Sequence, residues 1–265
     1  MTGVVRLEIL DGVAEIHFNR PDRLNMLDEA MARGFRDAVL SAVQATAVRV
    51  LLFTASGRGF CAGEDLAAFQ SSDDRGALAE RIIGPINEAL LAMANSGLPS
   101  IAALQGVIAG GGISLALAPD LAIADTNVRF NFGYLKIAAP LDCGGSHALV
   151  RLVGPRKAAE IKLLNPILDA QEARQLGLVN LVVPPVALRD TARSWARRLA
   201  ATPAEATART LALLRCVEAV PRADQLRAEM EAFAAAARTE AFGQAIGAFF
   251  VARDGEVQLP AAFRP

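Results

Sequence analysis

The sequence predicts an α/β fold, in which a mainly parallel β-sheet with helical crossovers is followed by a region of helices. Strand-like and helix-like segments alternate over the first part of the chain, a pattern typical of a parallel sheet. Beyond Arg151 the composition shifts towards Ala, Leu, Arg and Glu, and only one short strand is indicated, near VNLVV. With 265 residues, 53% of them hydrophobic, the chain can bury a large core. We expect residues 1–200 to form that core and residues 201–265 to form a helical region packed against it.

The first third of the chain predicts a hairpin, a helix and a buried strand. The segments VVRLEIL and VAEIHF flank Asp11-Gly12, a pair favoured in tight hairpin turns. The next stretch, from residue 27 to about 47, carries apolar residues at four-residue intervals and so has one apolar helical face. These residues are Leu27, Met31, Phe35, Val39 and Val43. The run VRVLLFTA that follows is typical of a buried strand.

The apolar segment Ile101–Ala118 is nearly long enough to span a membrane. However, three glycines at 110–112 interrupt it, and Pro119 ends it. We therefore expect a buried strand, a glycine turn and a buried helix, and no membrane contact. A helix over 77–94 precedes this segment, and helices are predicted after it at 156–164, 170–176, 186–201, 203–218 and 221–252.

Charge and cysteine content exclude several classes of function. Lys and Arg total 27 against 28 Asp and Glu, so the chain lacks the basic field that nucleic-acid binding requires. The three cysteines are far apart without a CxxC pair, which predicts neither a disulfide framework nor a metal site. The N-terminal segment shows no secretory signal pattern. A reducing cytoplasm is the expected location.

Two glycine-rich turns carry the strongest functional signal: FTASGRGFCAGEDL and GVIAGGGISLALAPDLAIA. In each, a buried strand breaks into small residues, which allow a ligand to approach the backbone closely. The second turn also opens a helix, whose first N–H groups lack partners within the helix. Either turn alone could be an ordinary tight connection. Together they predict a site that stabilises negative charge.

These motifs, with NRPDRLNML and the later DCGG segment, resemble the crotonase, or enoyl-CoA hydratase/isomerase, family from about residue 5 to residue 180. The resemblance implies a ββα spiral core and a C-terminal helical region that builds a homotrimer or a dimer of trimers. It also implies an acyl-CoA thioester substrate, with coenzyme A as part of the substrate and no permanently bound cofactor. The thioester carbonyl would lie in an oxyanion hole made of two backbone N–H groups.

The resemblance assigns Gly111 as one N–H donor and leaves Ala62 and Glu64 as candidates for the other. It also assigns two segments to the nucleotide end of coenzyme A. The residues concerned are Arg23, Leu24, Ala62, Gly63, Glu64, Asp65 and Leu66.

The acid–base residues depart from the hydratases of the family, which use two glutamates. Ser114 and Tyr134 stand at those positions here, which disfavours simple hydration and places both residues in the acyl pocket. Asp142, in the DCGG segment, is where the resemblance implies a base or proton shuttle, and the match is closest to epoxyphenylacetyl-CoA and dienoyl-CoA isomerases. Helix capping is the alternative role for Asp142.

The sequence therefore predicts an acyl-CoA isomerase with an aspartate base. Two alternatives stay open: a hydratase that uses other acid and base groups, and a non-catalytic homologue that binds acyl-CoA. The side chain of Glu64 either supplies a second acid at the pocket mouth or points to solvent.

Overall fold

A computed structural model describes residues 3–254, and its larger sheet has six strands in the order β1-β2-β3-β5-β7-β10. The strands β1 and β2 form the predicted antiparallel hairpin, turned at Asp11 and Gly12, whose φ angles are both positive. Every other pairing in this sheet is parallel, as predicted. The strands are β1 (Val5–Leu10), β2 (Val13–Phe18), β3 (Val50–Ala55), β5 (Ser100–Leu104), β7 (Leu121–Asp125) and β10 (Leu181–Val183).

A second sheet of four short strands, in the order β4-β6-β8-β9, was not predicted. Its strands have three residues each, too few to show a period of two in the sequence. Strands β4, β6 and β8 each follow a strand of the larger sheet, so successive chain segments add one strand to each sheet and the core has the expected ββα spiral. The strands are β4 (Gly59–Cys61), β6 (Val107–Ala109), β8 (Arg129–Asn131) and β9 (Ile167–Asp169).

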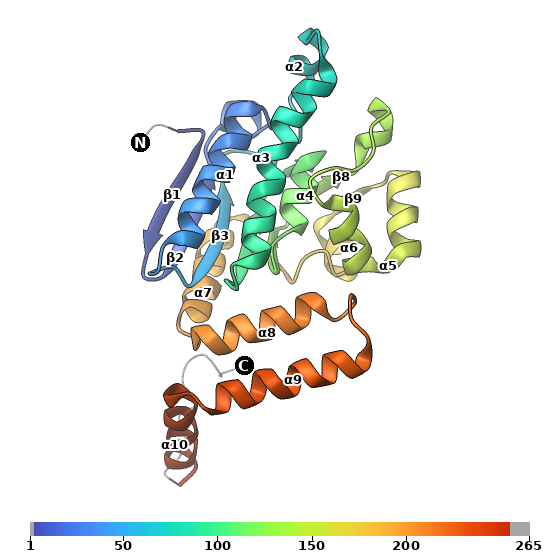
Figure 1. The fold of residues 1–265 in the computed structure, drawn as a ribbon. Coiled ribbons are helices and arrows are strands. Elements are labelled where there is room, and N and C mark those ends of the chain that lie inside the picture. The colour runs from blue at the N-terminus through green and yellow to red at the C-terminus, as the bar shows by residue number, and fades with distance from the viewer. Residues whose placement is uncertain (1–2, 255–265) are drawn as a thin grey trace.

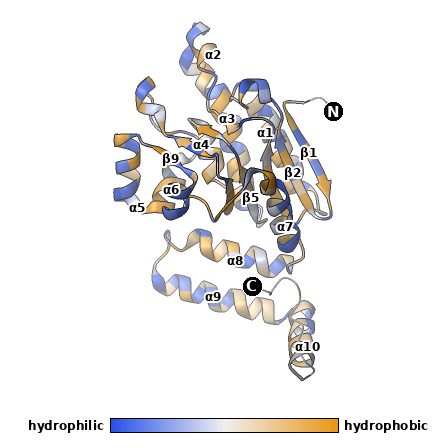
Figure 2. Ribbon diagram, turned by 180° about the vertical axis from the view of Figure 1, so that it is seen from behind, coloured by the Kyte–Doolittle hydropathy of each residue, from blue (hydrophilic) through white to orange (hydrophobic). Residues whose placement is uncertain are grey.

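Helices α1 (Glu29–Gln44) and α3 (Arg75–Asn95) pack side by side over one face of the larger sheet (Figure 1). Asp28 and Asp74 cap them by accepting hydrogen bonds from backbone N–H groups. Helix α4 (Gly111–Leu117) is entirely buried, in agreement with its predicted core position. Hydrophobic residues are concentrated where these helices meet the strands of the core (Figure 2). The short helix α2 (Leu66–Ser71) precedes α3.

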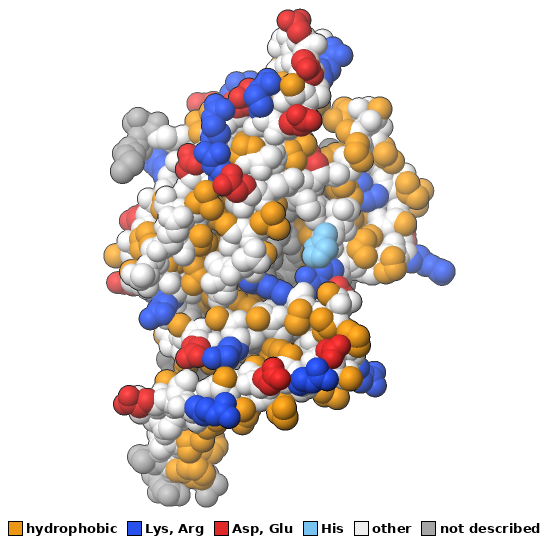
Figure 3. Space-filling view, viewed as in Figure 1, with side chains coloured by type: hydrophobic (Ala, Val, Ile, Leu, Met, Phe, Trp, Pro, Cys, Tyr) orange, Lys and Arg blue, Asp and Glu red, His pale blue; other side chains and the backbone are white. Residues whose placement is uncertain are grey.

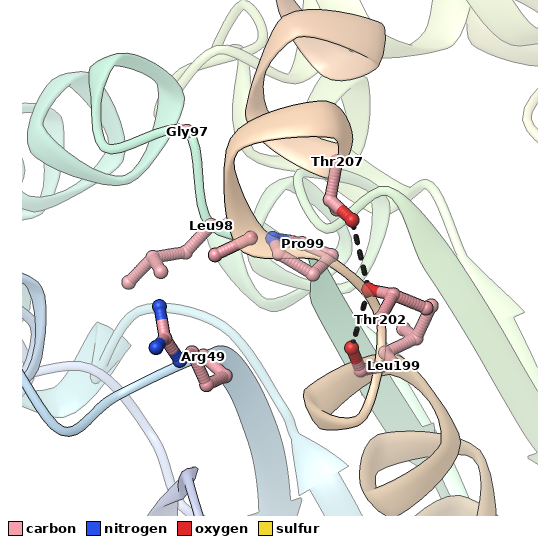
Figure 4. Close-up of a pocket in the computed structure, with 8 residues that line it drawn as sticks. Arg49, Gly97, Leu98, Pro99, Leu199, Thr202 and Thr207 are labelled. Carbon is pink, nitrogen blue, oxygen red and sulfur yellow. Dashed lines mark hydrogen bonds between the residues drawn. The ribbon is translucent and has the colours of Figure 1, made fainter. Parts of the chain in front are cut away.

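Helix α7 (Leu188–Ala200) covers the opposite face of the sheet, where it packs on β3, β5 and β7. At one edge of this contact, the carboxylate of Glu15 on β2 pairs with Arg189 at 3.1 Å and with Arg193 at 2.7 Å. A cavity of about 20 Å³ lies beside the end of α7 (Figure 4), where the Thr202 hydroxyl donates to the carbonyl of Leu199 and hydrogen-bonds to the hydroxyl of Thr207. That volume holds about one water molecule, so this is a small packing gap and not a substrate site.

Helix α5 (Gly145–Leu164) is longer than the predicted 156–164, and α6 (Ala170–Gln175) agrees with prediction. The prediction of one helix over 221–252 was wrong. The chain forms α9 (Arg222–Ala237) and α10 (Glu240–Asp254), and the hydroxyl of Thr239 accepts a hydrogen bond from Phe242 N–H at the start of α10.

Helices α8 (Ala204–Cys216) and α9 lie side by side below the core, and α10 turns away from the end of α9 (Figure 1). Residues 255–265 of the predicted helical region lie outside the described residues. In the described part of the chain, no helix combines the length and apolar character needed to cross a bilayer. The apolar segment 101–118 forms the predicted buried strand, β5, and the predicted buried helix, α4, with the unpredicted short strand β6 between them.

Replacing Phe18 by alanine is expected to destabilise the fold by about 3–5 kcal/mol, because it leaves a cavity in a tightly packed core. The Phe18 ring is 1% exposed and contacts Phe35 and Phe60, with ring centroids 5.8 and 5.2 Å away. Chemical denaturation at fixed protein concentration measures the loss. Val186→Ala, at a side chain that is 91% exposed, should stay within about 0.5 kcal/mol of wild type. Equal losses in the two variants would contradict this account of the core.

Candidate active site

The NRPDRLN segment is fixed to the end of β3 by Asn25, which is completely buried. Its side-chain amide donates to the carbonyls of Ser56 and Gly59, both at 3.0 Å, and its oxygen accepts from Arg20 N–H at 2.8 Å. Asn25 has a φ of 54°, a left-handed conformation that asparagine tolerates better than most residues. Asparagine at this position therefore both adopts the conformation that the turn needs and attaches the turn to the sheet through its side chain.

The same segment binds the first glycine-rich turn through backbone hydrogen bonds. Leu27 N–H donates to the carbonyl of Gly63 at 2.8 Å, and Asp65 N–H donates to the carbonyl of Leu27 at 2.9 Å. Ala62 N–H donates to the carbonyl of Leu24 at 3.0 Å. The two segments that the family resemblance assigns to coenzyme A are thus side by side in the fold.

An ion pair joins these two segments at the surface. The guanidinium of Arg23 lies 2.6 Å from the carboxylate of Asp65. The Asp65 side chain is 5% exposed and the Arg23 side chain 49% exposed, so the positive charge faces solvent while its partner is buried. Leu66, at the start of α2, is also exposed.

The two glycine-rich turns touch each other through their backbones. Gly63 has a φ of 85°, and a Cβ atom there would lie 2.7 Å from the carbonyl oxygen of Ala109. A Cβ atom on Gly112 would lie 2.2 Å from the carbonyl oxygen of Cys61. Both distances are shorter than real Cβ contacts, so any larger residue would separate the turns. Glycine is therefore required for the second turn to reach the first.

Two N–H groups converge on the carboxylate of Glu64 where these turns meet. Gly111 N–H donates to its two oxygens, at 3.0 and 3.2 Å. The backbone N–H of Glu64 itself also binds this carboxylate. The N–H of Ala62, in contrast, is engaged by Leu24. The arrangement forms a pair of donors from Glu64 and Gly111 that holds a carboxyl oxygen, and the Glu64 side chain turns inward and not to solvent.

Asp142 lies beside this donor pair, at the end of the loop before α5. Its carboxylate accepts a hydrogen bond of 2.6 Å from the hydroxyl of Tyr134, and its backbone carbonyl accepts one of 2.8 Å from the hydroxyl of Ser114. The carboxylate does not cap α5, whose N-cap residue is Gly144 without a side-chain cap bond. Ser114 and Tyr134, both buried, therefore orient Asp142 from two sides.

Burial and mutual repulsion shape the protonation of this cluster. Burial, followed by the negative charge of Asp142, raises the pKa of Glu64 to about 7. Burial, followed by the charges of Asp142 and Glu64, raises the pKa of Tyr134, so the phenol keeps its proton and remains a donor. Burial also raises the pKa of the Cys61 thiol to about 12 and that of Cys143 above its usual range. Neither thiol is a ready nucleophile.

The sequence did not single out Lys162 on α5, which lies behind Tyr134. Its ammonium is 4.2 Å from the centroid of the tyrosine ring, a cation–π distance, and donates to the carbonyl of Phe132 at 3.2 Å. Burial lowers the pKa of Lys162. No motif surrounds this lysine, and only its position in the folded chain reveals the contact with Tyr134.

The two histidines lie outside the cluster. His17 hydrogen-bonds to the hydroxyls of Thr54 and Ser56, both at 2.7 Å, and so joins β2 to β3. His147 is exposed on α5. His17 therefore has a structural role, and His147 faces solvent.

Glu64→Gln is expected to raise stability at pH 8 and leave it nearly unchanged at pH 4.5. The folded-state pKa of Glu64 lies above the usual 4.5, so the folded chain holds this proton more tightly than the unfolded chain. That stabilisation is complete below about pH 4.5 and is lost as the pH rises through about 7. Glutamine cannot ionise and avoids the loss, on the order of 1–3 kcal/mol. Thermal unfolding of wild type and Glu64→Gln at pH 4.5 and pH 8 measures this loss. The same stability difference between the two proteins at both pH values would contradict the ionisation of a buried Glu64.

Several proteins similar to this chain have names that refer to coenzyme-A thioesters. The family description "Enoyl-CoA hydratase/isomerase" matches residues 8–256. The 1,2-epoxyphenylacetyl-CoA isomerase of Escherichia coli (strain K12) is 35% identical over 197 residues, which cover 72% of this chain and 74% of that protein. The (E)-benzylidenesuccinyl-CoA hydratase of Thauera aromatica is 33% identical over 197 residues, covering 74% of this chain and 76% of the relative.

Solved structures agree over nearly the full chain. The crystal structure of an enoyl-CoA hydratase from Bacillus anthracis superimposes with a TM-score of 0.87 at 25% identity, covering 93% of this chain and 95% of that one. An enoyl-CoA hydratase from Mycobacterium smegmatis gives a TM-score of 0.85 at 28% identity, with 93% and 96% covered. The crotonase-like spiral and its C-terminal helices are thus shared with these proteins, and the chain belongs to the enoyl-CoA hydratase/isomerase family.

Proposed function

We propose that this protein is an acyl-CoA isomerase, in which the N–H groups of Glu64 and Gly111 hold the thioester oxygen and Asp142 moves the proton. The observation that carries the proposal is the convergence of these two N–H groups on one carboxylate oxygen pair beside Asp142. A substrate thioester would replace the Glu64 carboxylate at the donors. Of the two candidates for the first donor, Glu64 is favoured because Leu24 already engages the Ala62 N–H.

The donor pair lowers the barrier to forming an enolate. When a proton leaves the carbon next to the thioester, negative charge develops on the carbonyl oxygen, and two N–H groups held in place stabilise that charge without rearranging. Removing one such donor from comparable sites raises the activation barrier by about 3–4 kcal/mol. The glycine contacts that bring the two turns together therefore prepare the charge stabilisation.

Asp142 is suited to carry the proton between two carbon atoms. Its backbone is held by Ser114 and its carboxylate by Tyr134, so it faces the donor pair in a defined orientation. A double-bond shift needs a base that removes one proton and an acid that returns another. The residues Ser114 and Tyr134, which replace the paired glutamates of the family's hydratases, bind Asp142 and are not acid–base groups themselves.

Coenzyme A is proposed to bind as part of the substrate along the surface formed by Arg23-Leu24 and residues 62–66. Arg23 can exchange its partner Asp65 for a phosphate of the nucleotide, because its guanidinium is half exposed. The three cysteines are free, which fits the reducing cytoplasm that the sequence predicts. No permanently bound cofactor is required by this chemistry.

Hydration is the second candidate, since the Thauera relative is a hydratase and Glu64 places a second carboxyl beside Asp142. The E. coli relative is an isomerase. A screen of acyl-CoA thioesters by mass spectrometry separates the two candidates, because hydration adds the mass of water and isomerisation leaves the mass unchanged. The panel should include enoyl, dienoyl and aryl-epoxide thioesters. Binding without turnover of any thioester would instead support the non-catalytic homologue.

A homotrimer or a dimer of trimers is proposed for the assembly. Large apolar side chains on α8–α9 are exposed in the single chain, and hydrophobic surface lies among charges over these helices (Figure 3). Monomers rarely leave such residues uncovered in contiguous patches. The side chains are Leu214, Val217, Leu226, Met230 and Phe233, which are 49–67% exposed.

Asp142→Asn is expected to lower turnover of an accepted thioester at least about 100-fold, since an amide cannot remove the proton. Binding of the coenzyme-A thioester, measured by calorimetry, should change little, because the donor pair and the Arg23 surface are untouched. Asp190→Asn, at an exposed aspartate of α7, serves as the matched control and should retain wild-type turnover. Undiminished turnover in Asp142→Asn would remove the proposed base.

Sedimentation of the full chain is expected to give three or six times the 27.9 kDa of one chain. Phe233→Glu should shift the distribution towards smaller species, because it places a charge in the proposed subunit contact. Leu10→Glu, at a side chain that is 63% exposed on the hairpin edge, is the control and should keep the assembly. A monomeric wild-type chain would contradict the proposed assembly.

A further inference from the structure

We propose that the Glu64 carboxyl is a second proton-transfer group of this site, which returns a proton to the substrate while Asp142 removes one. The inference rests on the proposed function and deepens it. It assigns to the Glu64 side chain a role separate from that of the Glu64 backbone N–H. The backbone N–H of Glu64 would be enough to hold the thioester, and the proposed role explains why an ionisable side chain is also present there.

The position of the carboxyl supports this role. It lies 3.0 Å from Gly111 N–H, the donor proposed for the thioester oxygen, and it hydrogen-bonds to the Asp142 carboxyl. Any acyl group whose carbonyl replaces it at the donors must therefore pass between or beside both carboxyls. A Cβ atom on Gly111 would lie only 2.2 Å from the Glu64 oxygen, so this close approach also depends on glycine.

The charge of the cluster supports it as well. Among the described residues, neither Glu64 nor Asp142 has an ion-pair partner. The ammonium of Lys162 lies on the ring of Tyr134, where it interacts electrostatically with Asp142 without forming an ion pair. Burial and the neighbouring charge of Asp142 both disfavour ionisation of Glu64, so the Glu64 carboxyl holds its proton more tightly than an exposed acid does. The site then contains an acid and a base at the same time.

The proton transfers balance over one turnover. The thioester displaces Glu64, as COOH, from the two N–H groups. The Asp142 carboxylate takes a proton from one carbon, the C–H electrons enter the conjugated system, and the enolate oxygen is held by the donors. Glu64 then gives its proton to a different carbon, a C–H bond forms and the double bond has moved. A proton passes from Asp142 to Glu64 across their hydrogen bond and restores both groups.

The test compares Glu64→Gln with wild type in D2O, using the acyl-CoA that wild type turns over fastest in the thioester panel. Mass spectrometry follows product formation and, separately, deuterium incorporation into unreacted substrate. Glutamine should lower turnover at least about 100-fold, the usual contribution of a positioned acid. Deuterium should still enter the substrate, because Asp142 can remove a proton, exchange it with D2O and return a deuteron to the same carbon. Glu64→Asp should restore part of the turnover, and Glu231→Gln, at an exposed glutamate of α9, should behave as wild type.

The outcomes separate this inference from the proposed function. Turnover within about threefold of wild type in Glu64→Gln, together with loss in Asp142→Asn, would overturn the second proton-transfer group and leave Asp142 as the only one. Loss of both turnover and deuterium incorporation in Glu64→Gln would also overturn it, because Asp142 would then have failed to act alone. Retained turnover in Asp142→Asn, or no turnover of any thioester by wild type, would overturn the proposed function itself.

Discussion

The hydrogen bond from Gly111 N–H to the Glu64 carboxylate is the contact on which the site depends. It joins two turns that are 47 residues apart in the chain, at a point where the backbones nearly touch. Gly63 and Gly112 permit that approach, because a Cβ atom at either position would overlap a carbonyl oxygen of the other turn. The spacing of the two N–H donors is therefore set by backbone contact, which is more rigid than side-chain packing.

The two-sheet architecture explains why these turns meet. Strands β3, β5 and β7 of the larger sheet continue into β4, β6 and β8 of the smaller sheet, and the turns lie at successive steps of this spiral. The pairing of β4 with β6 holds the turns in adjacent positions. The buried Asn25 and the backbone bonds of Leu27 attach the NRPDRLN segment to the first turn, so the surface proposed for coenzyme A is continuous with the donor pair.

The electrostatics of the site oppose its stability. Burial and the nearby charge of Asp142 favour retention on Glu64 of a proton that a solvent-exposed acid would lose at neutral pH. Perturbed groups of this kind are typical of functional sites, where charge is arranged for chemistry and not for folding. Tyr134 offsets part of the cost through its hydrogen bond to Asp142, and Lys162 packs on the other face of its ring.

Local patterns in the sequence determined the hairpin, the parallel strands, helices α1 and α3 and the two glycine turns, whereas the family resemblance of the DCGG segment singled out Asp142. These features depend on residues close together in the chain, where periodicity, turn preference and motif spacing are visible. The break between α9 and α10 escaped prediction because alanine-rich sequence continues the helical pattern across Arg238 and Thr239. The three-residue strands were too short to show any period.

Only the tertiary structure decided how distant groups pair. It showed that Leu24 engages the Ala62 N–H, that the Glu64 carboxylate turns inward, and that Tyr134 donates to Asp142. Lys162 became visible only through its contact with the Tyr134 ring. The physical reason is that hydrogen-bond partners, burial and shifts in pKa arise from the three-dimensional neighbourhood, which depends on segments that no local pattern connects.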